Sequence, residues 1–236
     1  MTLKVLETKK LFYRKYPFKV ACLVDGAYYV ATYGTSQAVS KALEWERKYS
    51  GQTGWYGFSK KGRGQLDVVS LENFCLAVRQ LPENENIRVR AEGKHFNLFC
   101  LDQATYDEVS KSLKEWAYEV TAPKSDKDLQ YLVSNKAIKV LVDKLPHKQY
   151  KYKIVLKPNL KADQRAKLAS WVSKYSVEEL RPSPSTLAWF NNKTRYTQDP
   201  FMYVASDGMR TLVELYLGPN KSRTEEFVLR SSLEET

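Results

Sequence analysis

One stretch of sequence that occurs twice decides the fold: residues 10–20 read KLFYRKYPFKV and residues 144–154 read KLPHKQYKYKI. The copies lie 134 residues apart, and Lys, Leu, Tyr and Lys are identical at four positions. A second pair follows in the same order, FNLFCLD at 96–102 and FMYVASD at 201–207, here 105 residues apart. Each member of this pair is typical of a short apolar strand ending in Asp, a good helix N-cap. Matching pieces in a fixed order indicate an internal duplication.

The second copy predicts a C-terminal α+β unit over residues 148–236. Residues 176–190 contain Pro182 and Pro184 and are expected to be extended. The hydrophobic periodicity predicts strands at 152–156, 201–205 and 224–229, and helices at 162–175 and 207–217. The order βαββαβ is the split-βαβ plan of ferredoxin-like and RRM-like domains, in which two helices cover one face of an antiparallel sheet. The sequence therefore predicts two tandem units of this kind.

The N-terminal unit, residues 1–123, is predicted to be an expanded version. Asp25-Gly26 is a hairpin-turn signal between two expected strands. The expected strands are 18–24, 27–33, 87–91, 96–101 and 118–121, and the expected helices are 36–49, 71–81 and 103–116. Because the offsets are 134 and 105, this unit carries 29 additional residues between its matches. A predicted hairpin at 54–69 accounts for much of that surplus.

Residues 124–147 are predicted to link the two units. The segment begins with a polar, turn-like stretch and continues as an expected helix over 128–145. Its apolar points are Leu132, Ile138 and Leu141. This is too apolar for a disordered linker, so we expect it to pack between the units.

Charge is the main functional signal in the composition. Among 236 residues, 38 Lys and Arg stand against 27 Asp and Glu, which gives a net charge of +11 and a pI near 9.4. Such a surplus attracts phosphate backbones. The chain also has 16 Tyr and 5 Trp, and aromatic rings beside cations are what single-stranded nucleic acid requires. The expected partner is therefore RNA or single-stranded DNA.

The same composition indicates where the protein acts. Cys22, Cys75 and Cys100 have no disulfide or zinc spacing, so we expect reduced core residues and a reducing compartment. No run approaches the ~20 apolar residues of a membrane span, and the N-terminus has no signal-like stretch. We expect a cytoplasmic protein, or one in the host cytoplasm if it is viral or phage-encoded, with no membrane partner and no cofactor.

Three segments contain the candidate binding residues: the repeated stretches, the glycine-rich loop 59–64 and the polar loop 191–196. Glycine allows a backbone to approach phosphates closely. The alternative interpretations are a solvated hairpin tip and lysines that protect a sheet edge. The candidate nucleic-acid-binding residues are Lys10, Tyr13, Arg14, Lys15, Lys19, Lys60, Lys61, Arg63, Lys148, Lys151, Lys153, Lys193 and Arg195.

Catalytic patterns are weak in this sequence. It has no P-loop, GxSxG, HExxH or acidic cluster spaced for two metals. His95-Phe96-Asn97 resembles the His-hydrophobic-His strand of rolling-circle initiators, with Tyr106 as the nucleophile, but Asn97 replaces the second His. In size, basic charge and paired ferredoxin-like units the chain also resembles Cas6-like CRISPR RNA endonucleases, in which His147 or His95 would act as general acid or base. The glycine-rich loop of that family is missing.

The sequence thus favours a non-catalytic nucleic-acid-binding protein. The alternatives are a metal-independent endoribonuclease of the Cas6-like type, a degenerate rolling-circle endonuclease, and a structural or interaction protein whose basic surface serves solubility or assembly.

Overall fold

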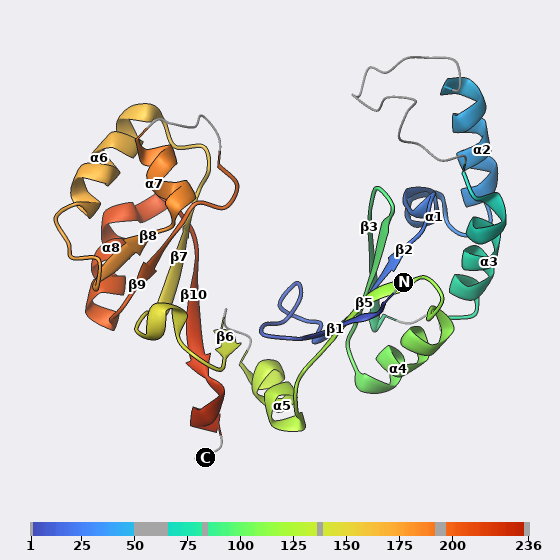
Figure 1. Ribbon diagram of the computed structural model, residues 1–236, viewed down its shortest axis with the longest axis horizontal. Coiled ribbons are helices and arrows are strands. Elements are labelled where there is room, and N and C mark those ends of the chain that lie inside the picture. Colours follow the sequence, from blue (N-terminus) through green and yellow to red (C-terminus); the bar gives the residue numbers. More distant parts are fainter. Residues whose placement is uncertain (1, 50–65, 82–84, 136–138, 192–196, 234–236) are drawn as a thin grey trace. The chain divides into compact units, whose positions relative to one another are not determined.

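The computed structural model describes residues 2–49, 66–81, 85–135, 139–191 and 197–233. Over these residues the chain forms helices and two five-stranded mixed sheets, so its class is mixed α+β (Figure 1). The chain divides into two units, Met1–Leu129 and Gln130–Thr236, and each contains one sheet. None of the helices in the described ranges is long and apolar enough to cross a membrane.

The first unit has the strand order β1-β5-β2-β4-β3. The edge strand β1 is parallel to β5, and the other neighbours are antiparallel. Its elements are β1 (Lys4–Glu7), β2 (Phe18–Leu23), α1 (Ala27–Tyr33), α2 (Ala38–Tyr49), α3 (Val68–Arg79), β3 (Ile87–Glu92), β4 (His95–Cys100), α4 (Gln103–Ser112) and β5 (Ala117–Ala122). The boundary between the units lies within α5 (Asp126–Ser134).

The second unit repeats this topology, with the strand order β6-β10-β7-β9-β8. Here β6 is parallel to β10, and the other neighbours are antiparallel. Its elements are β6 (Lys139–Val142), β7 (Tyr152–Leu156), α6 (Ala162–Val172), β8 (Leu180–Pro182), α7 (Pro184–Phe190), β9 (Phe201–Val204), α8 (Asp207–Leu217) and β10 (Lys221–Leu229). Three short 3₁₀ turns are η1 (Pro146–Lys148), η2 (Gly218–Asn220) and η3 (Arg230–Leu233).

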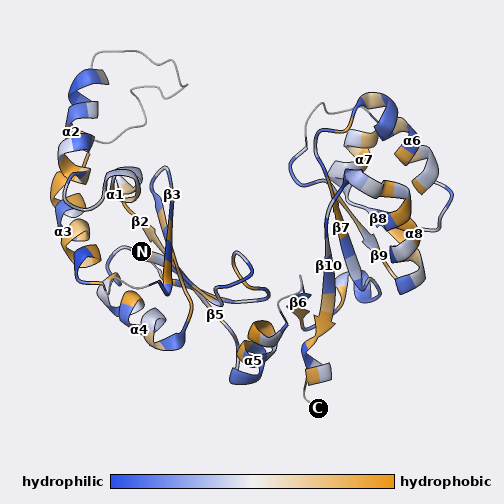
Figure 2. Ribbon diagram, turned by 180° about the vertical axis from the view of Figure 1, so that it is seen from behind, coloured by the Kyte–Doolittle hydropathy of each residue, from blue (hydrophilic) through white to orange (hydrophobic). Residues whose placement is uncertain are grey.

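In the described part of the chain, the helices cover one face of each sheet, and that face forms the core. Successive strand residues point to opposite faces, so Phe18, Val20 and Cys22 are buried under the helices while Lys19 points the other way. In the second unit Ile154 and Leu156 take the buried positions. The helices of each unit lie on this side of its sheet (Figure 1), and orange and blue mark their apolar and polar faces (Figure 2). We call the uncovered side the open face.

The three cysteines are free and buried, as predicted. Burial raises the pKa of Cys22 and of Cys100 to about 12. A thiol that stays protonated at neutral pH is a poor nucleophile, so these residues serve as core side chains.

The strand register shows that the predicted second match of the repeat is wrong by one residue. Phe18 pairs with Cys100, and Tyr152, its counterpart 134 residues on, pairs with Val204. The offset in this part is therefore 104 residues. The helix caps agree, because the N-cap of α4 is Asp102 and that of α8 is Ser206 rather than Asp207. A slip of one residue exchanges the two faces of a strand.

The predicted strand at 27–33 is also wrong, since these residues form α1. Gly26 has φ +87° and begins the helix instead of a hairpin. A Cβ at Gly26 would lie 2.8 Å from a Leu71 side-chain atom, so the close packing of α3 favours glycine here. The buried residues Ala27 and Val30 are three apart, which is a helical spacing. Packing on this spacing outweighs the strand propensity of Tyr and Val.

Two further expectations need correction. The helix predicted over 128–145 ends at Ser134, and the apolar residues 139–142 form β6, an edge strand that the sequence analysis missed together with β1. The extended segment predicted over 176–190 is extended only at β8. Ser183 caps α7, and Pro184 occupies the first turn of that helix, where proline is tolerated. The other predicted strands and helices of the described residues are confirmed within a few residues. The predicted hairpin at 54–69 lies outside the described residues up to residue 65, including its tip at 59–64, and its predicted end is wrong because Asp67 caps α3, which begins at Val68.

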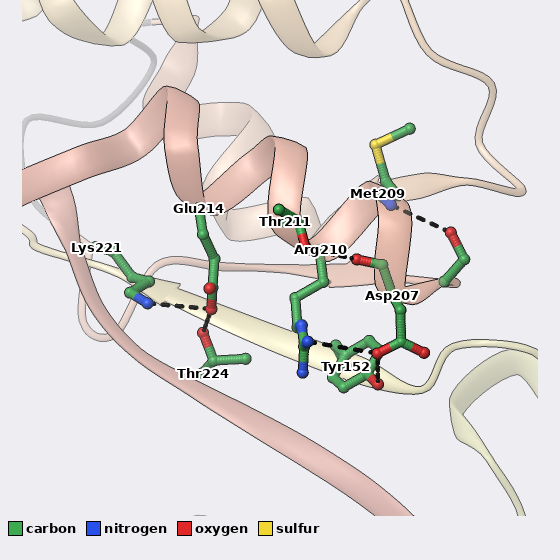
Figure 3. Close-up of polar contacts among 9 residues, drawn as sticks. Tyr152, Asp207, Met209, Arg210, Thr211, Glu214, Lys221 and Thr224 are labelled. Carbon is green, nitrogen blue, oxygen red and sulfur yellow. Dashed lines mark hydrogen bonds and ion pairs between the residues drawn. The ribbon is translucent and has the colours of Figure 1, made fainter.

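Polar contacts anchor α8 to the sheet of the second unit (Figure 3). The Tyr152 hydroxyl donates to Asp207 Oδ1 at 2.7 Å, and the Arg210 guanidinium lies 4.7 Å from the Tyr152 ring. Further along the helix, Glu214 accepts from Lys221 at 3.0 Å and from the Thr224 hydroxyl. In the first unit the corresponding contact is aromatic, because Phe18 stacks on Tyr106 with ring centroids 5.0 Å apart.

This difference between the units predicts a sensitivity to alkaline pH. Burial and the hydrogen bond to Asp207 raise the pKa of Tyr152 to about 12. A raised pKa stabilises the fold below the unfolded pKa of about 10, and that stability is lost as the pH rises from about 10 to 12. Tyr152→Phe introduces phenylalanine, which the first unit has at the equivalent position, Phe18. The variant has no phenol to ionise, so it does not lose this stability as the pH rises. Relative to wild type, the variant should therefore gain about 1 kcal/mol in unfolding free energy between about pH 9 and pH 11. Urea unfolding of both proteins at the two pH values measures this change. A stability difference between variant and wild type that stays the same at the two pH values would contradict the prediction.

Candidate nucleic-acid interface

The repeated stretch encodes a loop with an unusual backbone rather than a strand. Two consecutive residues are left-handed in each copy, Tyr13 and Arg14 at φ 51° and 59°, and His147 and Lys148 at φ 49° and 66°. The turns are closed by equivalent hydrogen bonds, from Tyr16 N to Phe12 O at 2.9 Å and from Tyr150 N to Pro146 O at 3.1 Å. The loop therefore precedes β2 and β7, which begin at Phe18 and Tyr152. Only the last residues of each repeat lie on a strand.

These loops hold four of the five left-handed non-glycine residues in the described part of the chain. Such a conformation costs roughly 1–2 kcal/mol per residue for an L-amino acid. Strain of this kind persists where the surrounding structure enforces it, and it gathers at functional sites. Its repetition at equivalent positions in both units makes the two loops the natural centre of a candidate site.

In the first unit the loop brings a ring and a cation together on the open face. The edge of Tyr13 packs on Phe99 of β4, with ring centroids 4.9 Å apart and an interplanar angle of 87°. The guanidinium of Arg88, from β3, lies 4.0 Å from the centre of the Tyr13 ring. Arg90 also donates to the Tyr13 hydroxyl at 3.3 Å. Phe99 is 6% exposed and forms the floor, while Tyr13 is 40% exposed. We call Tyr13, Arg88 and Phe99 the unit-1 cluster.

The second unit places a ring and an arginine at the equivalent positions, with a different contact between them. His147 packs on Tyr203 of β9, with ring centroids 5.6 Å apart and an interplanar angle of 71°. Arg181, from β8, lies with its Nη1 3.3 Å from His147 Nδ1. Arg88 pairs with Phe99 and Arg181 pairs with Tyr203 in the two sheets, so the positions are equivalent. We call His147, Arg181 and Tyr203 the unit-2 cluster.

The floor of the unit-2 cluster is rigidly supported. Tyr150 is fully buried and stacks on Tyr203, with centroids 5.6 Å apart and planes at 20°. Its hydroxyl donates to the carbonyl of Val177. Burial and the nearby Glu225 raise the pKa of Tyr203. Tyr203 therefore stays uncharged at neutral pH and serves as an aromatic platform.

The structure describes eight of the thirteen predicted site residues. Tyr13, Arg14 and Lys15 lie together on the first loop and are exposed, and so are Lys148 and Lys151 around the second. Lys10 is exposed just before the first loop. Lys60, Lys61, Arg63, Lys193 and Arg195 lie outside the described residues, and their role stays a prediction.

The two strand lysines have a different role from the exposed cations. Lys19 pairs with Glu119 at 2.6 Å, and Lys153 pairs with Glu225 at 3.6 Å. Lys153 also lies 4.4 Å from the ring centre of Phe201. Both lysines are less than a quarter exposed, so they hold neighbouring strands together and contribute less to an outer surface than the loop cations do.

The sequence analysis missed Arg88, Phe99, Arg181 and Tyr203. Phe99 and Tyr203 lie in the second matched segment, but their contacts with the loops depend on the pairing of strands in the folded sheet. A usable signal was nevertheless present. In Ile87-Arg88-Val89-Arg90 the arginines alternate with apolar residues, and this pattern predicts cations along one face of a strand.

No match to this chain appears among family models, curated proteins or solved structures. The description of the site therefore rests on its own geometry and on the internal comparison of the two units.

The catalytic alternatives can be located in the same structure. His95 lies on the open face of β4, with its Nδ1 3.1 Å from the Tyr118 hydroxyl. Tyr106, the nucleophile that a rolling-circle mechanism would need, stacks on Phe18 on the covered face. Burial raises the pKa of Tyr106, which weakens it as a nucleophile. Among the described residues no group of three or more His, Cys, Asp or Glu side chains could hold a metal ion.

Proposed function

We propose that the protein binds single-stranded nucleic acid, RNA or DNA, without catalysing a reaction, through the open faces of two ferredoxin-like units. The four-strand orders β5-β2-β4-β3 and β10-β7-β9-β8 support this assignment, because each follows the split-βαβ plan with one edge strand added. RNA-recognition domains of this plan stack bases on aromatic residues of the open sheet face.

The observation that carries the proposal is that each unit places an exposed ring beside an exposed arginine at equivalent positions. Tyr13 with Arg88 and His147 with Arg181 occupy these positions, although the residue types and the ring–arginine contacts differ. All four side chains are exposed, so a ligand can reach them. Stacking of a base on a ring, together with a cation for the phosphate, is how proteins bind single strands.

The surrounding charge supports the same proposal. Exposed Arg14, Lys15, Lys148 and Lys151 flank the clusters, and the open-face carboxylates Glu92, Glu119 and Glu225 are each paired with a cation. Glu119 contacts Lys19, and Glu225 contacts Lys153 and Arg223. A strand approaching either face therefore meets more available cations than acids. This agrees with the net charge of +11.

The proposal is tested by salt-dependent binding of short single strands. We expect labelled oligo-U and oligo-dT of about 20 nucleotides to bind at low salt, with log K falling linearly against log salt at a slope of about −0.7 for each phosphate contact. A blunt DNA duplex of equal length should bind at least about tenfold more weakly, because its bases cannot stack on the rings. Fluorescence anisotropy measures both. Absence of binding at about 50 mM salt, or equal affinity for the duplex, would rule the proposal out.

A second candidate is a metal-independent endoribonuclease, and the specific observation in its favour is the His147–Arg181 pair. An exposed imidazole beside a guanidinium provides a general acid or base and a cation for a developing charge. Incubating labelled RNA with the protein and a chelator distinguishes the candidates. Cleavage products that disappear with His147→Ala would establish this activity, and intact RNA that remains bound would support the non-catalytic proposal.

A further inference from the structure

An exposed imidazole and an exposed guanidinium lie side by side in the second unit. Arg181 Nη1 lies 3.3 Å from His147 Nδ1, and both side chains are exposed. A guanidinium has only donors, and an imidazolium donates from both ring nitrogens. The pair therefore offers donors that one anion can accept together.

The groups around this pair are cationic or aromatic. Lys148 on the same loop and Lys151 before β7 are exposed, and the rings of Tyr150 and Tyr203 lie against the imidazole. On the neighbouring strands, Lys153 and Arg223 are paired with the buried Glu225. In the described part of the chain no carboxylate is bonded to His147 or Arg181.

We propose that His147 and Arg181 together bind one phosphate group of the nucleic acid, and that the imidazole takes up one proton as they do so. This inference rests on the proposed function. On binding, the contact between Arg181 Nη1 and His147 Nδ1 opens, and Nδ1 takes up a proton from solvent. Imidazolium and guanidinium then each donate one hydrogen bond to phosphate oxygens. The phosphate anion beside the imidazole favours its protonated form.

The direction of the pH dependence follows from this exchange. The bound state holds one more proton than the free state, so the affinity rises as the pH falls. The change takes place over the range in which an imidazole ordinarily titrates, about pH 8 to 5. For one proton the affinity changes by at most about tenfold per pH unit.

The first unit supplies an internal control for this behaviour. Tyr13 occupies the position of His147, with the same left-handed backbone and a comparable ring contact below it. A phenol takes up no proton near neutral pH. His147→Tyr therefore inserts a residue that the equivalent loop already accommodates, and it removes only the titrating group. His95 is the other histidine of the chain, so His95→Gln is the matched control.

The test measures oligo-dT affinity by fluorescence anisotropy at constant ionic strength. We expect wild type and His95→Gln to bind about three- to tenfold more tightly at about pH 5.5 than at about pH 7.5, and His147→Tyr to show no such change. NMR gives an independent readout, because two histidines give two Hε1 signals. Saturating oligo-dT should raise the titration midpoint of the signal that is missing in His147→Tyr.

The outcomes separate this inference from the proposed function. Salt-dependent binding with no pH dependence, or a pH dependence that survives in His147→Tyr, would overturn the phosphate site and leave the proposed function standing. Failure of the wild-type protein to bind any single strand at low salt would overturn both.

Discussion

Removing the exposed ring and its arginine from both units should abolish most of the affinity for single strands. Each stacked base contributes roughly 1–3 kcal/mol by alanine substitution. We therefore expect Tyr13→Ala with Arg88→Ala, or His147→Ala with Arg181→Ala, to weaken binding of a 20-nucleotide strand by about 10- to 100-fold. The four substitutions together should cost more than about 100-fold, leaving mainly non-specific attraction to phosphates. Fluorescence anisotropy at one fixed salt concentration measures the series.

Matched lysine variants make this experiment specific. Lys111 on α4 and Lys167 on α6 are exposed, and their helices cover the opposite face of each sheet. Replacing either by Ala lowers the charge by one without touching an open face, so affinity should change less than about threefold. Melting temperatures of all variants should remain close to wild type, because the deleted side chains are exposed. Equal losses for the lysine and cluster variants would mean that net charge alone drives binding.

The largest expected effect on stability comes from the last turn of α8. Leu217 is 2% exposed and belongs to the core of the second unit, and it is equivalent to the fully buried Leu113, the C-cap residue of α4. Leu217→Ala deletes buried methyl groups and leaves a cavity that the neighbours fill incompletely. Such substitutions cost about 2–5 kcal/mol. We expect a loss of this size in urea unfolding followed by circular dichroism.

The same helix provides the control, since Leu215 is 76% exposed two residues earlier. Leu215→Ala makes the same chemical change at the surface and should alter the unfolding free energy by no more than about 0.5 kcal/mol. If the two variants were equally stable, the assignment of Leu217 to the core would be wrong.

Much of the secondary structure could be predicted from local patterns. The strand at 152–156 and the helix at 207–217 match β7 and α8 residue for residue, because alternation and helical periodicity are strong there. The predictions of secondary structure were wrong where a local pattern was compatible with both a helix and a strand. Residues 27–33 have strand propensity yet form α1, and residues 139–142 were absorbed into a predicted helix yet form β6. In each case a packing partner distant in the sequence made the choice.

The candidate site was predictable only in part, for the same reason. Sequence comparison identified Tyr13, Arg14, Lys15, Lys148 and Lys151 because they lie within or beside one local repeat. It gave no indication that Tyr13 would meet Arg88 and Phe99, which are more than seventy residues away. That meeting depends on strand pairing, and the one-residue error in the second match would have assigned Tyr203 to the wrong face.

Local sequence therefore determined the charge, the internal repeat and the periodic helices and strands, because these depend on composition and on residues a few positions apart. Only the tertiary structure decided the left-handed loops, the register of the sheets and the ring-and-arginine clusters. These features depend on contacts between distant segments, whose alignment is set by how the whole core packs. Each open face thereby carries one such cluster, built on tyrosine in the first unit and on histidine in the second.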